Sequence, residues 1–244
     1  MILKRRVTDA EVIAEFLKNE FYQKEYDKDR EGFEHLVLNP DLADDAQNAV
    51  RRALLYRRRG HMWREIPSDT VWHEATIDAE DLKRIRVFPR AHWRKVSDGS
   101  FLLSEIVRRI RESAIAHTDP AFLKIQLLRY RLQCESVNST VLLIGVDEEL
   151  PLTILEGNHR LAAAMLVSPE LVHTGFRMIC GLSSRMYESC WYDTNIPTLW
   201  TYIKNRLANL VDKEADVGRA LSATGENTTP TFARTMKTEK AQAK

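Results

Sequence analysis

The stretch Leu152-Thr153-Ile154-Leu155-Glu156-Gly157-Asn158-His159-Arg160-Leu161-Ala162-Ala163-Ala164-Met165-Leu166 decides the fold that we expect. Its first four residues are apolar or β-branched and predict a short, buried strand. Its last six are strong helix formers. Only residues 156–160 lie between the two, so the strand must turn directly into the helix.

The chemistry of this turn predicts an anion site. Gly157 permits a backbone bend that a residue with a Cβ would resist, and Asn158 is expected to be the N-cap of the helix. The free N–H groups at the helix start would then lie beside His159 and Arg160, and phosphate is the usual occupant of such a place. The same kind of turn is also common as plain architecture.

Length and charge set limits on the class of protein. A chain of 244 residues, 44% of them hydrophobic, can form one large domain or a domain with an accessory region. The 36 basic and 35 acidic residues give a net charge of +1. This balance argues against a nucleic-acid-binding surface over the whole molecule, although a local basic patch is still allowed.

Cysteine usage and hydropathy exclude several further classes. Cys134, Cys180 and Cys190 show neither CxxC nor Cys/His ligand spacing, so the sequence supports no disulfide framework and no structural zinc site. The first residues lack the apolar run of a signal peptide, and no stretch has the length of a membrane span. We therefore expect a soluble, cytoplasmic protein without a membrane partner.

Periodicity and capping residues predict alternating helices and strands, and hence an α/β (α+β) fold. A capping box at Thr8–Glu11 starts the first helix, and Asp119-Pro120 is an N-cap with an N1 proline. Helices are predicted at 8–26, 41–60, 101–116, 119–132 and 197–211, a helical turn from Asp78, and strands at 70–77, 140–146, 152–155 and 176–182. The expected organisation is a helical N-terminal region (1–69), an α/β domain (70–183), a C-terminal helical extension (184–212) and a flexible tail (213–244).

Two basic clusters stand out. The end of the second predicted helix carries Arg51, Arg52, Arg57, Arg58 and Arg59. These are either solvated charges that complement the helix C-terminus or a patch that binds the phosphates of a nucleic acid. Residues 86–95 are basic and interleaved with aromatic residues. Within them Arg90 and His92 could line a polyanion site, or simply extend along the surface.

The order of elements resembles the ParB/sulfiredoxin superfamily over residues about 70–183, and residues 156–164 resemble its nucleotide-phosphate motif. The resemblance implies a domain built on a small mixed sheet. Sulfiredoxins have a catalytic cysteine directly before the His-Arg pair, where this chain has Asn158. Chromosome-partitioning ParB proteins carry Glu-Arg-Arg after the glycine, and their helix-turn-helix is not evident here. The free-serine kinases, with an acidic residue followed by Gly-His-His-Arg, are the most similar; residues 156–160 read Glu-Gly-Asn-His-Arg.

The resemblance implies a nucleotide-binding phosphotransferase (a kinase) that acts on a small hydroxyl-bearing metabolite, with ATP, ADP or CTP and Mg²⁺ as cofactors. The nucleotide would be bound by Gly157, Asn158, His159 and Arg160 together with Arg90 and His92. Glu156 and His159 are the expected catalytic residues. Glu156 could bind Mg²⁺, act as the base, or merely cap the turn.

The resemblance also implies a second acidic residue from the early part of the domain. Glu74 is the first candidate, with Asp78 and Glu105 as alternatives. A rival hypothesis is a ParB-like DNA-binding protein, nuclease or CTP-dependent switch that uses the five helix arginines, and a third is an inactive scaffold. The sequence does not indicate the oligomeric state.

Overall fold

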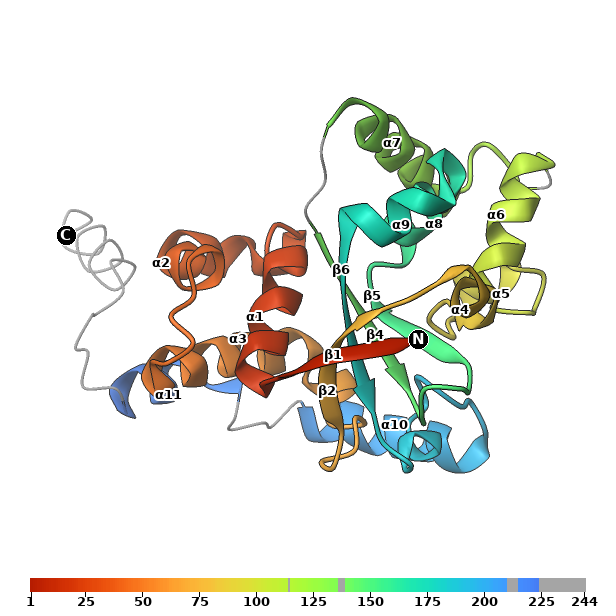
Figure 1. Cartoon of the computed structure of the whole chain (residues 1–244). Helices are drawn as coiled ribbons and strands as arrows, with labels where there is room; N and C mark the ends of the chain where they lie inside the picture. The colour runs from red at the N-terminus through yellow and green to blue at the C-terminus, as the bar shows by residue number, and fades with distance from the viewer. Residues whose placement is uncertain (114, 136–138, 210–214, 224–244) are drawn as a thin grey trace, which may run out of the picture.

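The computed structural model describes residues 1–113, 115–135, 139–209 and 215–223 (Figure 1). The protein has a mixed α/β fold around a mixed sheet with the strand order β1-β2-β6-β4-β5-β3, which confirms the predicted fold class. The strands are β1 (Ile2–Val7), β2 (Val71–Thr76), β3 (Ile85–Arg86), β4 (Ser139–Gly145), β5 (Leu152–Glu156) and β6 (Phe176–Leu182).

The centre of the sheet is formed by β4 and β6, which run parallel to each other. Both strands are nearly continuous apolar runs, and Val141 to Ile144 are fully buried. Such runs are typical of strands that are covered on both faces. The neighbours β2 and β5 pair antiparallel with this central pair, and β3 adds a short parallel edge to β5.

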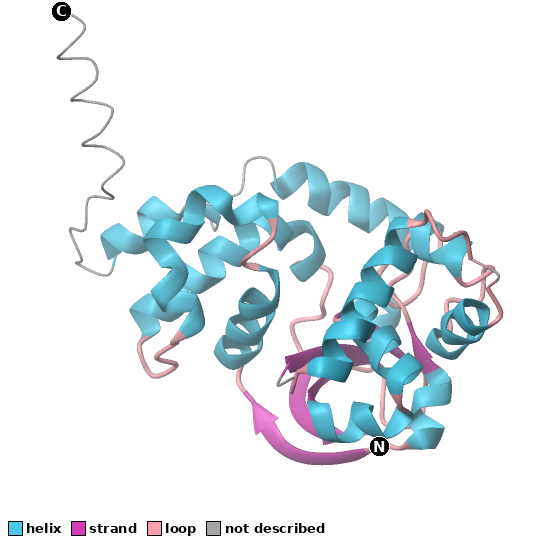
Figure 2. Cartoon of the chain, turned by 90° about the horizontal axis from the view of Figure 1, so that it is seen from above, coloured by secondary structure: helices cyan, strands magenta, loops and turns pink. Residues whose placement is uncertain are grey.

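Helices gather at the two ends of the sheet (Figures 1 and 2). At one end lies a group of four helices, α1 (Asp9–Glu20), α2 (Asp27–Leu38), α3 (Asp45–Trp63) and α11 (Val217–Ala223). The 3₁₀ turn η1 (Lys24–Tyr26) connects α1 to α2. The remaining α-helices are α4 (Ala79–Arg84), α5 (Ala91–Val96), α6 (Leu103–Arg111), α7 (Pro120–Cys134), α8 (Asn158–Val167), α9 (Pro169–Gly175) and α10 (Ile196–Ala208); η2 (Met186–Glu188) is a 3₁₀ turn. Among these, α8 packs against α6, α7 and α9, and α10 packs against α3.

The sequence indicated a helical N-terminal region, but this region also contains a strand. β1 forms the edge of the sheet and pairs antiparallel with β2, and α1 packs on β4. The charged stretch near residue 30 contains the unpredicted helix α2, which buries Leu36 and Val37. α3 continues through Gly60, which was expected to end it. The absent Cβ at Gly60 leaves room for the side chain of Asn209.

The predicted flexible tail is wrong for its first part. Residues 217–223 form α11, which packs on α3 and buries Val217, so the low apolar density concealed a docked helix. Residues 213–214 and 224–244 of the predicted tail lie outside the described residues. No helix in the described part of the chain has the length and apolar character needed to cross a membrane.

Glu65, shortly after α3, is a buried carboxyl group that accepts one hydrogen bond from the described residues. Its side chain is 5% exposed, and Oε2 accepts a 3.0 Å hydrogen bond from the Cys190 N–H. Oε1 has no hydrogen-bond partner within the described residues. Burial raises the pKa of Glu65 from 4.5 to about 7, against the lowering effect of the Cys190 amide. Between pH 4.5 and about 7 the folded protein keeps a proton on Glu65 that the unfolded chain has already released. The free energy of unfolding therefore falls as the pH rises through this range.

We predict that Glu65→Gln removes most of this pH dependence. The amide oxygen of Gln can still accept from Cys190, so the variant should be about 1–3 kcal/mol more stable than the parent at pH 8 and no more stable at pH 4. Denaturant unfolding at both pH values measures this. The control is Glu31→Gln, which alters an exposed carboxylate of α2. If both variants follow the parent curve, Glu65 ionises normally in the folded protein.

Candidate functional site

The turn from β5 to α8 contains the expected glycine bend. Gly157 is the N-cap of α8 and has φ 109°, in the left-handed region that glycine favours. A Cβ at Gly157 would also come within 3.0 Å of the Val141 side chain. Asn158 is the first residue of the helix and not its N-cap, contrary to the expectation. Its Oδ1 instead accepts a 3.0 Å hydrogen bond from the Phe88 N–H, which fixes the turn to the loop after β3.

A cavity of about 450 Å³ opens beside this turn. Its walls come from α1, the segment after α1, α3, the loop between β3 and α5, α7 and the turn itself. The polar residues that line it are Asn19, Glu20, Gln23, Glu25, Arg59, Arg90, Lys124, Glu156, Asn158, His159 and Arg160. The N-terminal region therefore supplies one wall, and the site is not confined to residues 70–183.

Arg160 is already satisfied by protein groups. Its guanidinium donates to Glu156 Oε1 at 2.8 Å, to Asn19 Oδ1 at 2.6 Å and to the Ser139 hydroxyl. These partners come from β5, α1 and β4. The side chain thus joins three elements behind the turn, and its fork is not free to bind a phosphate in the way that the sequence had suggested.

His159 is a neutral residue. Its ring packs on that of Trp93, with 4.8 Å between the centroids. Burial lowers the pKa of His159 to about 3, and the nearby charge of Lys124 lowers it further. At neutral pH the imidazole can therefore donate or accept one hydrogen bond in the cavity, but it adds no positive charge.

Three carboxylates line the cavity, those of Glu20, Glu25 and Glu156, and each lies near an arginine. Glu25 Oε1 is 3.8 Å from the Arg59 guanidinium. Glu156 pairs with Arg160, and Glu20 accepts from Arg59, with a 3.0 Å bond from Nε. Burial raises the pKa of Glu156 and the neighbouring Glu20 raises it further, although Arg160 acts in the opposite direction. Glu20 was not predicted, because its position at the end of α1 acquires meaning only when α1 packs beside the turn.

Unpaired positive charge comes from Arg90 and Lys124. Neither forms an ion pair with a carboxylate of the described residues; the Arg90 guanidinium lies over the Phe88 ring, 4.8 Å from its centroid. The N–H groups of Asn158, His159 and Arg160 also lack an acceptor among these residues. Free amides at a helix start, together with two unpaired cations, attract an anion.

The other predicted site residues lie elsewhere. Glu74 pairs with Arg177 and Arg5 at 3.0 and 3.2 Å, in an ion-pair network outside the cavity lining. His92 has Nε2 3.6 Å from Asp119 Oδ1 and does not line the cavity. The alternative carboxylates also have structural partners: Asp78 caps α4 and Glu105 pairs with Arg108.

The arginine-rich part of α3 does not form a basic face. Arg51 is fully buried and donates to the carbonyl oxygens of Leu36 (3.1 Å) and Asp41 (2.6 Å). Arg57 and Arg58 pair with Asp29, and Arg59 pairs with Glu20. Arg52 is the one member of the five that is exposed and without such a partner in the described chain. The charges therefore hold α3 to its neighbours, which weakens the nucleic-acid hypothesis.

No group of three or more His, Cys, Asp or Glu side chains in the described ranges is arranged to hold a metal ion. Mg²⁺ commonly binds through one or two carboxylates together with substrate phosphates and water. Glu20 could fill this part, with a nucleotide supplying the other oxygens.

No protein-family model matches the chain, and comparisons with curated proteins and with solved structures found no match.

We predict that Arg51→Ala lowers the free energy of unfolding by about 2–4 kcal/mol, because it leaves buried carbonyl oxygens without a donor. Arg94→Ala, which removes an exposed arginine of α5, should change it by less than about 0.5 kcal/mol. Denaturant unfolding measures both values. Equal stability of the two variants would mean that Arg51 is a surface charge, and would restore the basic patch as a candidate.

Proposed function

We propose that the protein binds a nucleoside polyphosphate in the cavity beside Gly157 and transfers a phosphoryl group to a small hydroxyl-bearing metabolite. The observation that carries this proposal is the combination, in one cavity, of unpaired cations, free helix amides and three carboxylates. The resemblance of residues 156–160 to the motif of the free-serine kinases of the ParB/sulfiredoxin superfamily supports the same reaction class.

The phosphates would lie at the start of α8. There the amides of residues 158–160 can donate to phosphate oxygens, while Lys124 and Arg90 supply full positive charges from two other elements. The neutral His159 adds a further hydrogen-bond donor. Arg160 would contribute from behind, by fixing the turn that carries these amides.

A second, aromatic cavity of about 470 Å³ offers a place for the nucleoside. It shares Arg59 and Arg90 with the first cavity, so the two adjoin at these side chains. Its lining includes His61, Trp191 and Tyr202, and the rings of Trp191 and Tyr202 meet edge to face with 5.4 Å between centroids. Burial lowers the pKa of His61 to about 4. A neutral imidazole and aromatic rings suit an uncharged base.

Glu156 is the candidate general base. In the proposed reaction the acceptor hydroxyl oxygen attacks the terminal phosphorus, its proton passes to Glu156, and the bond to the nucleoside diphosphate breaks. A raised pKa brings the carboxyl group closer to the working pH, which favours proton transfer. Bound Mg²⁺ would neutralise part of the phosphate charge, and Lys124 and Arg90 would do the same from the protein.

We predict that Lys124→Ala weakens binding of both MgATP and tripolyphosphate by about ten-fold or more, because each loses a charge-assisted contact. Tyr202→Ala should weaken MgATP binding and leave tripolyphosphate binding unchanged, since only the nucleotide has a base. Lys95→Ala, which removes an exposed lysine outside the cavity lining, is the matched control. Isothermal titration calorimetry measures the affinities.

The same titrations with ADP and CTP compare nucleotides. Binding that Lys124→Ala and Lys95→Ala weaken equally would reflect general charge attraction and would remove the site. Failure of every nucleotide to bind, or to raise the melting temperature, would also contradict the proposal, because a ligand of the native state must stabilise it.

The base assignment has a separate test. Glu156→Gln keeps the size of the side chain and an oxygen that can accept from Arg160. We expect it to retain nucleotide binding and to lose phosphoryl transfer to a hydroxyl acceptor, free serine being the first to try, by about 10²- to 10⁴-fold. Release of nucleoside diphosphate and ³¹P NMR of the product measure the rate. A variant as active as the parent would exclude Glu156 as the base.

A further inference from the structure

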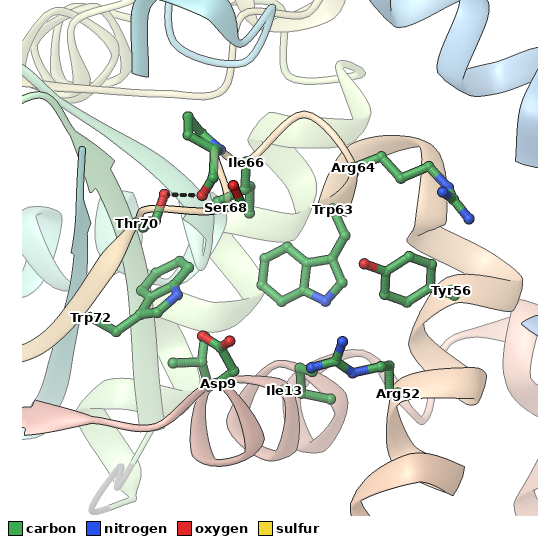
Figure 3. Close-up of a pocket in the computed structure, with 12 residues that line it drawn as sticks. Asp9, Ile13, Arg52, Tyr56, Trp63, Arg64, Ile66, Ser68, Thr70 and Trp72 are labelled. Atoms are coloured by element: carbon green, nitrogen blue, oxygen red, sulfur yellow. Dashed lines mark hydrogen bonds between the residues drawn. The ribbon is translucent and has the colours of Figure 1, made fainter. Parts of the chain in front are cut away.

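A third cavity, of about 340 Å³, has no lining residue in common with the two described above. It lies between the start of α1, the part of α3 from Arg52 onward, the loop 66–70 and Trp72 of β2 (Figure 3). Trp63 packs on Phe16, with 5.4 Å between the centroids, and Phe16 lines the nucleotide cavity. The two sites are therefore neighbours separated by core side chains.

The walls of this cavity are aromatic. Trp63 and Trp72 have 6.1 Å between their ring centroids and an interplanar angle of 60°, and both are less than one-tenth exposed. Tyr56 lies beside Trp63 in Figure 3, and Ile13 closes the same space from α1. Rings fixed in this way favour a planar or large apolar group over a sugar or an ion.

Two opposite charges stand unpaired at the edge of the cavity. Asp9 comes from the first turn of α1 and Arg52 from α3, and Figure 3 shows them on either side of Ile13. Neither side chain has a hydrogen bond or an ion pair with another of the described residues, whereas the other four arginines of the α3 cluster all have partners. A ligand with a single charge would leave one of the two without a partner.

The indole nitrogen of Trp63 is a buried donor without an acceptor in the described chain. Figure 3 shows this nitrogen on the edge of the ring that faces Arg52. A buried donor left unsatisfied costs free energy. The long Arg52 side chain can turn toward the indole nitrogen. An anionic group bound to Arg52 would then place an acceptor at the same edge of the Trp63 ring.

We propose that this cavity binds a free α-amino acid with an aromatic or large apolar side chain. The α-carboxylate accepts hydrogen bonds from Arg52 and from the Trp63 indole N–H, and the α-ammonium group donates to Asp9. The side chain of the ligand lies against Trp63 and Trp72. A zwitterion with one apolar arm satisfies the two charges, the buried donor and the aromatic walls together. This site does not depend on the proposed phosphoryl transfer.

Calorimetric titration of the full chain with three probes tests each contact. L-phenylalanine carries both charged groups, 3-phenylpropionate lacks the ammonium group, and phenethylamine lacks the carboxylate. We expect L-phenylalanine to bind about ten-fold or more tightly than either analogue. Asp9→Asn should weaken L-phenylalanine to the level of 3-phenylpropionate and leave that analogue unchanged. Arg52→Gln should weaken L-phenylalanine and 3-phenylpropionate alike, and Trp63→Phe should weaken both to a smaller extent.

Arg94→Gln is the control for arginine loss, and circular dichroism confirms that each variant is folded. Absence of L-phenylalanine binding at millimolar concentration would overturn the proposal, as would affinities that neither Asp9→Asn nor Arg52→Gln changes. Displacement of L-phenylalanine by MgATP would place the amino acid in the nucleotide cavity and would also overturn it. Because the variants leave the nucleotide cavity intact, a failure here is distinguishable from a failure of nucleotide binding.

Discussion

The three hydrogen bonds of the Arg160 guanidinium are the interaction on which the arrangement of the site depends. They connect Glu156 at the end of β5, Asn19 in α1 and Ser139 at the start of β4. Asn19 also donates to the Thr140 carbonyl oxygen at 2.9 Å, so the same corner is fixed twice. The N-terminal helical group is thereby held against the sheet, and the cavity exists because these two parts meet there.

The structure uses most of its buried charge for assembly. Arg51 satisfies backbone carbonyls between α2 and α3, Arg59 holds Glu20, and Arg160 holds Glu156. Each of these three arginines is occupied by protein groups, although a sequence pattern would assign it to ligand binding. The charges that remain available are fewer and come from separate elements, which is why Arg90 and Lys124 define the anion-attracting side of the cavity and Arg52 marks the edge of another.

Local signals predicted the elements well where a strong capping residue or an uninterrupted apolar run was present. β6 has the predicted bounds, Asp119-Pro120 opens α7, and the turn at Gly157 has the backbone bend that its glycine indicated. The strand β1 was missed because an edge strand with three consecutive basic residues has little apolar signal, and α2 was missed because its buried face is small.

The composition of the site was less predictable. Glu156, His159 and Arg90 line the cavity as expected, whereas Glu74 and His92 do not. Which carboxylate from the early part of the chain reaches the turn depends on the packing of α1, and no local pattern encodes that. The protonation of His159 likewise follows from its burial against Trp93 and not from its neighbours in sequence.

The position of β1 also determines how copies of the chain can meet. An open strand edge is a template for pairing with another chain, and charged side chains discourage such pairing. Lys4, Arg5 and Arg6 are exposed along β1, and the opposite edge of the sheet is only the two-residue strand β3. Lateral growth of the sheet from molecule to molecule, the first step toward fibrous aggregates, is therefore disfavoured at both borders.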